Sequence, residues 1–242
     1  MNSSPSSAAS SRYHLGIDMA WGERNPDGCC LIHARSDRAT IESLHLSHGD
    51  DALLELAAAL PPDAECTLAV DAPVVCRNPH GSRPVDRESH RVFGHWLCGC
   101  HPVNQRLAPR PLRIARQLGQ LGFTPGWRGR RILMEVYPHP AIVAWFGLPR
   151  RIAYKRGPVR SRRREFARLQ RLLRGQLATL APLLQLDPAT RKLLDLPWSK
   201  PVEDQTDALL CALIAYWHHR HDGRRSRVLG DLDHGFLVTP AT

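Results

Sequence analysis

Short apolar runs separated by turn-forming residues indicate five β-strands. In the first of them, Leu15, Ile17 and Met19 alternate with other residues, which is the period of a strand buried on one face. The segment Asn25-Pro-Asp-Gly28 that follows is a strong turn signal, so the first two strands are expected to form a hairpin. The expected strands cover residues 13–20, 29–33, 39–46, 67–71 and 131–137.

Apolar residues at helical spacing fill most of the segments after the third strand. Helices are expected at residues 50–60, 87–98, 110–121, 139–147, 161–180 and 203–221, and a late strand-like segment at 229–238. A three-stranded meander followed by two right-handed crossover connections predicts an α/β fold with a five-stranded mixed sheet, in the order 3-2-1-4-5, flanked by helices. Ligands of such sheets collect at the carboxyl ends of the strands, near the point where the strand order reverses.

The length and composition fit one domain. A chain of 242 residues buries roughly 70% of the surface that its unfolded form exposes, so it does not need disulfides to fold. The seven cysteines lack the even spacing of a disulfide framework, and no run approaches the ~20 apolar residues of a membrane span. We expect a cytoplasmic protein without membrane contact, with a disordered tail at residues 1–12 and a single domain at 13–242.

Five acidic residues stand where the predicted strands end or the last helix begins. Asp18 lies near the end of the first strand, Asp71 ends the fourth, and Glu135 lies in the fifth. Asp204 and Asp207 are three residues apart, which places both on one face of the last helix. Each acid alone has an ordinary structural role, as a helix cap or a turn residue. Together they would repel one another unless a cation compensates them, and such hard oxygen ligands suit Mg²⁺ or Mn²⁺.

The positive charge of the chain is concentrated in one segment. Between Arg150 and Arg174 stand ten arginines and one lysine against a single acid, so this segment alone carries the net charge of +10. It belongs to a helical, arginine-rich insertion expected at about residues 148–200. Such a patch favours a polyanionic partner, here nucleic acid, although a solvated helix face remains the alternative. The arginines expected to contact nucleic acid are Arg163, Arg164, Arg168 and Arg171.

Several spaced motifs resemble those of one protein family. They are Gly16-Ile-Asp18-Met-Ala-Trp21, Val70-Asp71-Ala-Pro73, Glu135-Val-Tyr-Pro138-His-Pro140, Tyr154-Lys155, Asp204-x-x-Asp207-Ala208 and Gly235-Phe-Leu-Val-x-Pro240. In this order they resemble the DUF429 family, described as predicted nucleases of the ribonuclease H fold. The resemblance implies a ribonuclease H-like fold and a site similar to that of RuvC-type resolvases. Those enzymes carry Glu on the fourth strand, where this chain has the shorter Asp71.

A nuclease of this kind would hydrolyse phosphodiester bonds of nucleic acid by a two-metal mechanism. Asp18, Asp71 and Asp207 are expected to hold the Mg²⁺ or Mn²⁺ ions. Asp204 or Glu135 would act as outer ligands or orient water, and a lysine would neutralise charge on the phosphate. The expected catalytic residues are thus Asp18, Asp71, Glu135, Asp204, Asp207 and Lys155.

Two other functions stay open at this point. One is a non-catalytic nucleic-acid-binding module on the same scaffold. The other is an ATP-dependent phosphotransferase of the actin and sugar-kinase type, which is disfavoured because Pro73 follows Asp71 closely; phosphate-binding turns need backbone N–H groups that proline lacks. The cluster His95, Cys98, Cys100 and His101 allows a zinc site, but buried helical cysteines are the simpler interpretation. The kind of nucleic acid and the oligomeric state are left undetermined by the sequence.

Overall fold

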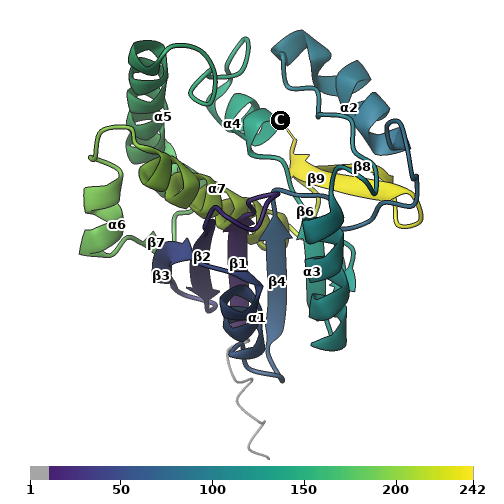
Figure 1. Ribbon diagram of the computed structural model, residues 1–242. Helices are drawn as coiled ribbons and strands as arrows, with labels where there is room; N and C mark the ends of the chain where they lie inside the picture. The colour runs from purple at the N-terminus through teal and green to yellow at the C-terminus, as the bar shows by residue number, and fades with distance from the viewer. Residues whose placement is uncertain (1–10, 242) are drawn as a thin grey trace, which may run out of the picture.

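The central element is a seven-stranded sheet (Figure 1) in the order β5-β6-β4-β1-β2-β3-β7. The computed structural model describes residues 11–241; most of the predicted tail therefore lies outside the described residues, and Arg12 already belongs to β1. In chain order the strands are β1 Arg12–Asp18, β2 Asp27–Ala34, β3 Ala39–Ser47, β4 Glu65–Val70, β5 Thr124–Pro125, β6 Arg131–Glu135 and β7 Leu184–Gln185.

The sheet is mixed and mostly parallel. The pairs β1–β2 and β2–β3 are antiparallel, whereas β1–β4, β4–β6, β5–β6 and β3–β7 are parallel. The prediction of five strands is wrong in number, because β5 and β7 extend the two edges. Each of these added strands is two residues long, too short to show the alternation by which a strand is recognised in a sequence.

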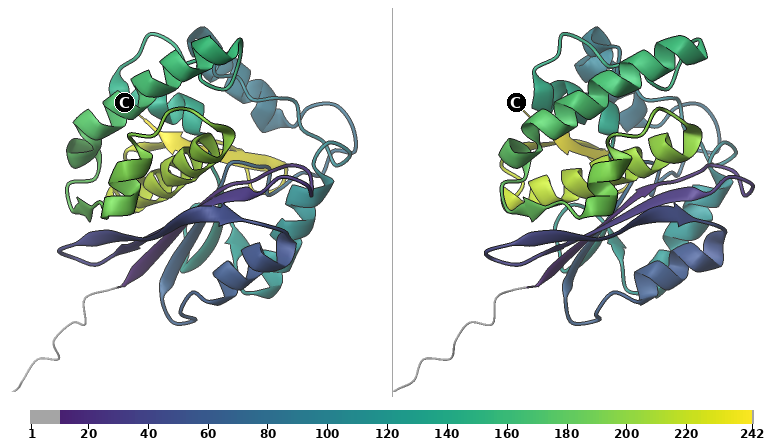
Figure 2. Two further views of the ribbon diagram at one scale, coloured as in Figure 1. Left: turned by 60° about the vertical axis from the view of Figure 1, so that its left-hand side comes forward. Right: turned by 90° about the vertical axis from the view of Figure 1, so that its left-hand side faces the viewer.

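Helices cover both faces of the sheet (Figure 2). α1 and α3 lie on one face, and α7 lies on the other beneath α5. The helices are α1 Asp50–Ala58, α2 Pro84–Phe93, α3 Pro109–Gln120, α4 Pro138–Phe146, α5 Val159–Leu180, α6 Pro188–Leu193 and α7 Lys200–Arg220, with a 3₁₀ turn at Gly94–Trp96. Within residues 11–241, none of them combines the length and the apolarity needed to cross a bilayer.

The late strand-like segment is a hairpin rather than one strand. β8 Ser226–Asp231 and β9 Gly235–Pro240 pair in an antiparallel two-stranded sheet. Asp231 Oδ1 accepts the backbone N–H groups of Asp233 and His234 at 2.8 and 2.7 Å, which closes the turn. Val238 bridges to Val136, so the hairpin lies beside the carboxyl end of β6.

Two glycines allow α7 to lie directly on the sheet. A Cβ atom at Gly16 of β1 would stand 2.2 Å from the Ala208 carbonyl oxygen, and one at Gly28 of β2 would stand 2.2 Å from the Asp204 carbonyl oxygen. Both distances are far below van der Waals contact, so any side chain at either position would push the helix away. The absence of these side chains brings the first turns of α7 over the carboxyl end of β1.

Candidate functional site

Three of the predicted acids meet where β1 and β4 end beneath α7. Asp18 is the last residue of β1, and Asp71 directly follows β4. The Asp71 N–H donates to the Ile17 carbonyl at 3.0 Å, so the two chain segments stay side by side as the sheet ends. Asp207 stands on α7 with a side chain that is 0% exposed. The topology of the sheet and the close approach of α7 thus bring Asp18, Asp71 and Asp207 together.

Lys155 lies at the point where these carboxylates converge. Its Nζ is 2.8 Å from Asp207 Oδ2, 3.8 Å from Asp18 Oδ1 and 3.9 Å from Asp71 Oδ2. The neighbouring Tyr154 donates its hydroxyl to Asp207 Oδ1 at 2.6 Å. The Tyr154-Lys155 pair therefore fixes Asp207 from one side and supplies one positive charge to three acids.

One ammonium group does not fully compensate this cluster. Burial raises the pKa of Asp18 to about 6, that of Asp71 to about 7 and that of Asp207 to about 6, although Lys155 acts in the opposite direction on all three. Raised carboxyl pKa values mean that the charged forms are disfavoured where they stand. The cluster is short of positive charge at neutral pH, which is the condition under which a further cation would be bound.

Asp204 borders the same cluster but has its own partner. Lys200, at the start of α7, places its Nζ 2.5 Å from Asp204 Oδ1 and 2.9 Å from Glu203 Oε1. Asp204 also lies within hydrogen-bonding reach of Asp18, and burial raises its pKa. The structure thus places Asp204 at the rim of the group, between Asp18 and a lysine that the sequence analysis had not singled out.

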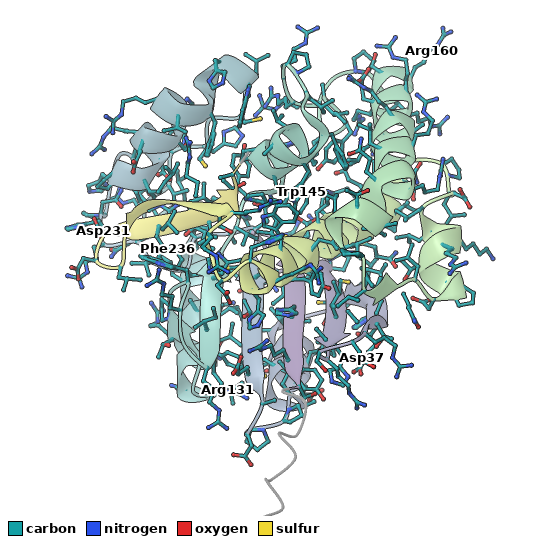
Figure 3. The ribbon with its side chains drawn as sticks, turned by 180° about the vertical axis from the view of Figure 1, so that it is seen from behind. Asp37, Arg131, Trp145, Arg160, Asp231 and Phe236 are labelled. Carbon is teal, nitrogen blue, oxygen red and sulfur yellow. The ribbon has the colours of Figure 1, made fainter. Side chains whose placement is uncertain are left out.

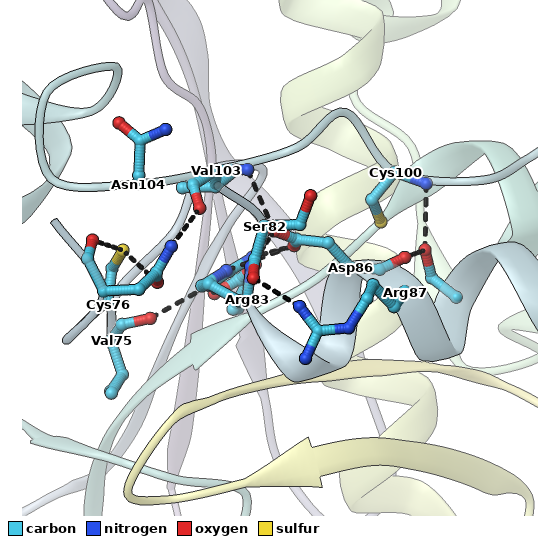
Figure 4. Close-up of polar contacts among 12 residues, drawn as sticks. Val75, Cys76, Ser82, Arg83, Asp86, Arg87, Cys100, Val103 and Asn104 are labelled. Atoms are coloured by element: carbon cyan, nitrogen blue, oxygen red, sulfur yellow. Dashed lines mark hydrogen bonds and ion pairs between the residues drawn. The ribbon is translucent and has the colours of Figure 1, made fainter. Parts of the chain in front are cut away.

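Glu135 lies near the other carboxylates, and its charge helps to raise the pKa of Asp71, but it does not join them around Lys155. β4 and β6 pair with Val70 opposite Glu135, so Glu135 shares the sheet face of Val70, and Asp71, one residue further, points to the opposite face. Arg83 donates to Glu135 at 2.6 and 2.8 Å. The same guanidinium donates to Asp86 Oδ1 at 2.9 Å (Figure 4). All three side chains are buried, so Glu135 belongs to an ion-pair network that joins α2 to β6.

The donor chemistry of Asp18, Asp71 and Asp207 fits a hard divalent cation, because all three offer carboxylate oxygens. The arrangement is not that of a ready metal site: within residues 11–241, no three or more His, Cys, Asp or Glu side chains are placed together so that they could hold an ion. The point of convergence is taken by Lys155 Nζ. Metal binding by these residues therefore requires Lys155 to move away.

A cavity of about 430 Å³ opens beside the acids. Asp18, Asp71, Glu135 and Asp204 contribute carboxylates to its lining. Four basic side chains that were not among the predicted catalytic or nucleic-acid-binding residues line it as well: His101, His139, Arg151 and Arg156. For His139 a signal existed, since it belongs to the Glu135–Pro140 motif. His101 belongs to the cluster considered for zinc, and no local pattern distinguishes Arg151 and Arg156 from the remaining arginines of their segment.

The four arginines predicted to contact nucleic acid lie on the exposed side of α5. Arg163, Arg164, Arg168 and Arg171 are exposed. The apolar residues at helical spacing on the other side of α5 are all buried: Phe166, Leu169, Leu173, Leu177 and Leu180. Figure 3 shows Arg160, at the start of the same helix, pointing away from the body of the protein. None of the four borders the cavity.

The cluster of His95, Cys98, Cys100 and His101 is not gathered into a metal group within the described part of the chain. Cys98 is buried and packs with Phe93, while the His101 ring faces Arg156 instead, with 2.7 Å between Nε2 and the guanidinium. The predicted helix at 87–98 ends earlier, at Phe93, so these cysteines lie in the connection that follows the 3₁₀ turn rather than on a helix.

Comparison with known proteins identifies one family. Searches of curated proteins and of solved structures find no match. The family model described as "Protein of unknown function (DUF429)" matches residues 16–234, which include the three converging acids and Lys155. Since the match spans nearly the whole chain, the protein belongs to the DUF429 family.

Proposed function

We propose that this protein is a divalent-metal-dependent nuclease with a ribonuclease H-like fold. The observation that carries the proposal is the convergence of three carboxylates, from β1, from the end of β4 and from α7, on one cationic group. The Asp207 side chain is fully buried, and those of Asp18 and Asp71 are 13% and 22% exposed. The strand order β3-β2-β1-β4-β6 within the sheet supports the fold assignment, since an antiparallel meander is followed there by two parallel strands.

In this proposal, Asp18, Asp71 and Asp207 hold Mg²⁺ or Mn²⁺. The bound cation would activate water and stabilise the leaving oxygen of a phosphodiester. Tyr154 keeps Asp207 in place through its hydrogen bond of 2.6 Å. Lys155, which also lines the cavity, would turn from the acids toward the substrate and offset charge on the phosphate.

The proposal is tested by cleavage. The full chain is incubated with labelled single-stranded DNA, single-stranded RNA, duplex DNA, an RNA–DNA hybrid and a four-way junction, each with Mg²⁺, with Mn²⁺ or with EDTA. We expect at least one of these substrates to be cut with metal and none with EDTA. No cleavage with either metal, or cleavage that persists in EDTA, would contradict the proposal.

A second candidate is a nucleic-acid-binding module without catalysis. The observation that favours it is the position of Lys155 Nζ, 2.8 Å from Asp207, where a metal ion would be expected. If this lysine does not move, it keeps the place of a metal ion occupied. The cleavage panel separates the two: binding of nucleic acid without metal-dependent cleavage is the outcome that this candidate predicts.

The arginine face of α5 is expected to contribute to nucleic-acid affinity through phosphate contacts. Replacing Arg164, Arg168 and Arg171 together by Gln should flatten the plot of log affinity against log salt by up to about 2.7, at roughly 0.9 for each lost contact with duplex DNA. Glu165 already pairs with Arg164 and Arg168, so Arg171 should show the largest single effect. Fluorescence anisotropy over a range of salt concentrations measures this slope. An unchanged slope in the folded triple variant would show that the face is only solvated.

A further inference from the structure

The cavity beside the acids is lined by groups of both charges. Asp18 and Asp71 line it at the carboxyl ends of β1 and β4, and Lys155 lies within 4 Å of both carboxylates. The connection from α4 to α5, to which Lys155 belongs, also contributes Arg151 and Arg156 to the lining. A ligand that occupies the cavity would therefore meet guanidinium groups as well as carboxylates.

The two arginines of this connection have no acidic partners among the described residues. Neither Arg151 nor Arg156 makes an ion pair with an acid of residues 11–241; Arg156 instead points a guanidinium nitrogen at His101 Nε2, 2.7 Å away. His139 Nδ1 is buried and has no hydrogen-bond partner within that range either. Burial, together with the nearby positive charges, Lys155 and Arg151 foremost, lowers the pKa of His139 to about 3. Unpaired guanidinium groups around a neutral imidazole form a site for an anionic group.

An aromatic side chain stands at the cavity on a fixed loop. Trp21 lines the cavity and is 40% exposed, although large aromatic side chains are usually covered. The base of its loop between β1 and β2 is anchored: Asp27 Oδ1 accepts the Ala20 N–H at 2.8 Å, and Arg110 donates to Asp27 Oδ2 at 2.6 Å. An accessible indole on such a loop is a stacking surface for a nucleobase.

We propose that this cavity binds one phosphorylated nucleotide, with its phosphate on Arg151 and Arg156 and its base against Trp21. The volume of about 430 Å³ is that of a pocket for one small ligand, and enzymes that act on single nucleotides enclose them in pockets of this kind. The ligand is either a free mononucleotide or the terminal, phosphate-bearing residue of a strand. The choice of a nucleotide, rather than another phosphorylated ligand, rests on the proposed nuclease function.

Calorimetric titration of the full chain tests this site without any metal. In EDTA, the wild type is titrated with adenosine 5′-monophosphate, adenosine, ribose 5-phosphate and a 5′-phosphorylated oligonucleotide. We expect Arg151→Gln and Arg156→Gln each to weaken binding of the monophosphate about 10- to 100-fold, as for lost hydrogen bonds to a charged group. Trp21→Ala should weaken it about 5- to 100-fold while leaving ribose 5-phosphate unaffected. The matched control, Arg38→Gln, replaces an exposed arginine of the turn between β2 and β3 that does not line the cavity, and it should leave all affinities unchanged.

The outcomes separate this inference from the proposed function. Binding of the mononucleotide supports the site. If the phosphorylated oligonucleotide also binds, the ligand can be the end of a strand; if it does not, the ligand is a free mononucleotide. Equal binding of adenosine and its monophosphate, or unchanged affinity in a folded Arg151→Gln/Arg156→Gln variant, would overturn it. Nucleotide binding without cleavage of the panel would uphold the site and reject the nuclease; metal-dependent cleavage with no nucleotide bound would do the reverse.

Discussion

Asp207→Asn is expected to lower metal-dependent cleavage by about a thousandfold. A metal ion supplies several kcal/mol of transition-state stabilisation, and each ~1.4 kcal/mol corresponds to a factor of ten in rate. The substitution removes the charge but keeps Oδ1, so the Tyr154 hydroxyl can still donate to this side chain, as it does to Asp207 at 2.6 Å. The variant should therefore fold, and the rate constant under single-turnover conditions is the quantity to compare.

Glu203→Gln is the matched control for this experiment. Glu203 is also a buried acid on α7, about one turn before Asp207, but its side chain binds Lys200 and Trp198. Its amide variant should cut at a rate within a few fold of the wild type. Equal losses in the two variants would mean that the acids of α7 act through stability, and an undiminished rate in Asp207→Asn would remove this residue from the mechanism.

Arg83→Met is expected to destabilise the fold by about 3–5 kcal/mol. The substitution leaves Glu135 and Asp86 buried without their shared partner, and an uncompensated buried charge costs this much. Arg83 also donates to the Val75 carbonyl at 3.0 Å, so the loop after β4 loses an anchor as well. Equilibrium unfolding in urea, at a pH where both acids are ionised in the unfolded chain, measures the loss.

The control for this prediction is another arginine of the same loop. Arg77 pairs with Asp233, but both side chains are about 70% exposed, and exposed pairs contribute about 0–1 kcal/mol. Arg77→Met should therefore change the free energy of unfolding by less than about 1 kcal/mol. If the two substitutions cost the same, the Arg83 network does not stabilise the protein as its burial implies.

The grouping of Asp18, Asp71 and Asp207 was accessible from the sequence, because parallel strands end at one edge and a helix must cover the sheet. The sheet face to which each acidic side chain points could not be predicted from the sequence. Glu135 stands at the end of an apolar strand just as Asp71 does, yet a difference of one residue in register turns it toward Arg83. Strand register depends on packing between distant segments, which no local pattern in a single sequence reveals.

Other features of the fold could not be predicted because they also depend on packing between distant segments. Gly16 reads as an ordinary residue of a strand, and its role appears only when α7 is seen to leave no space for a Cβ atom. α6 and β7 are short and take their structure from the core that they complete beside α5. The basic side chains of the cavity come from three segments: His101 from the connection before α3, His139 from α4, and Arg151 and Arg156 from the connection between α4 and α5. The approach of these segments to one another follows from the tertiary fold.

Anomalous diffraction from crystals grown with Mn²⁺ tests the central claim most directly, because it locates the metal irrespective of substrate. We expect anomalous density among the carboxylates of Asp18, Asp71 and Asp207, with Lys155 withdrawn from its present position 2.8 Å from Asp207. In crystals of Asp18→Asn grown under the same conditions, this density should be lost. Lys155 still seated between the acids, with no anomalous density beside them at saturating Mn²⁺, would contradict the assignment of these residues as a metal site.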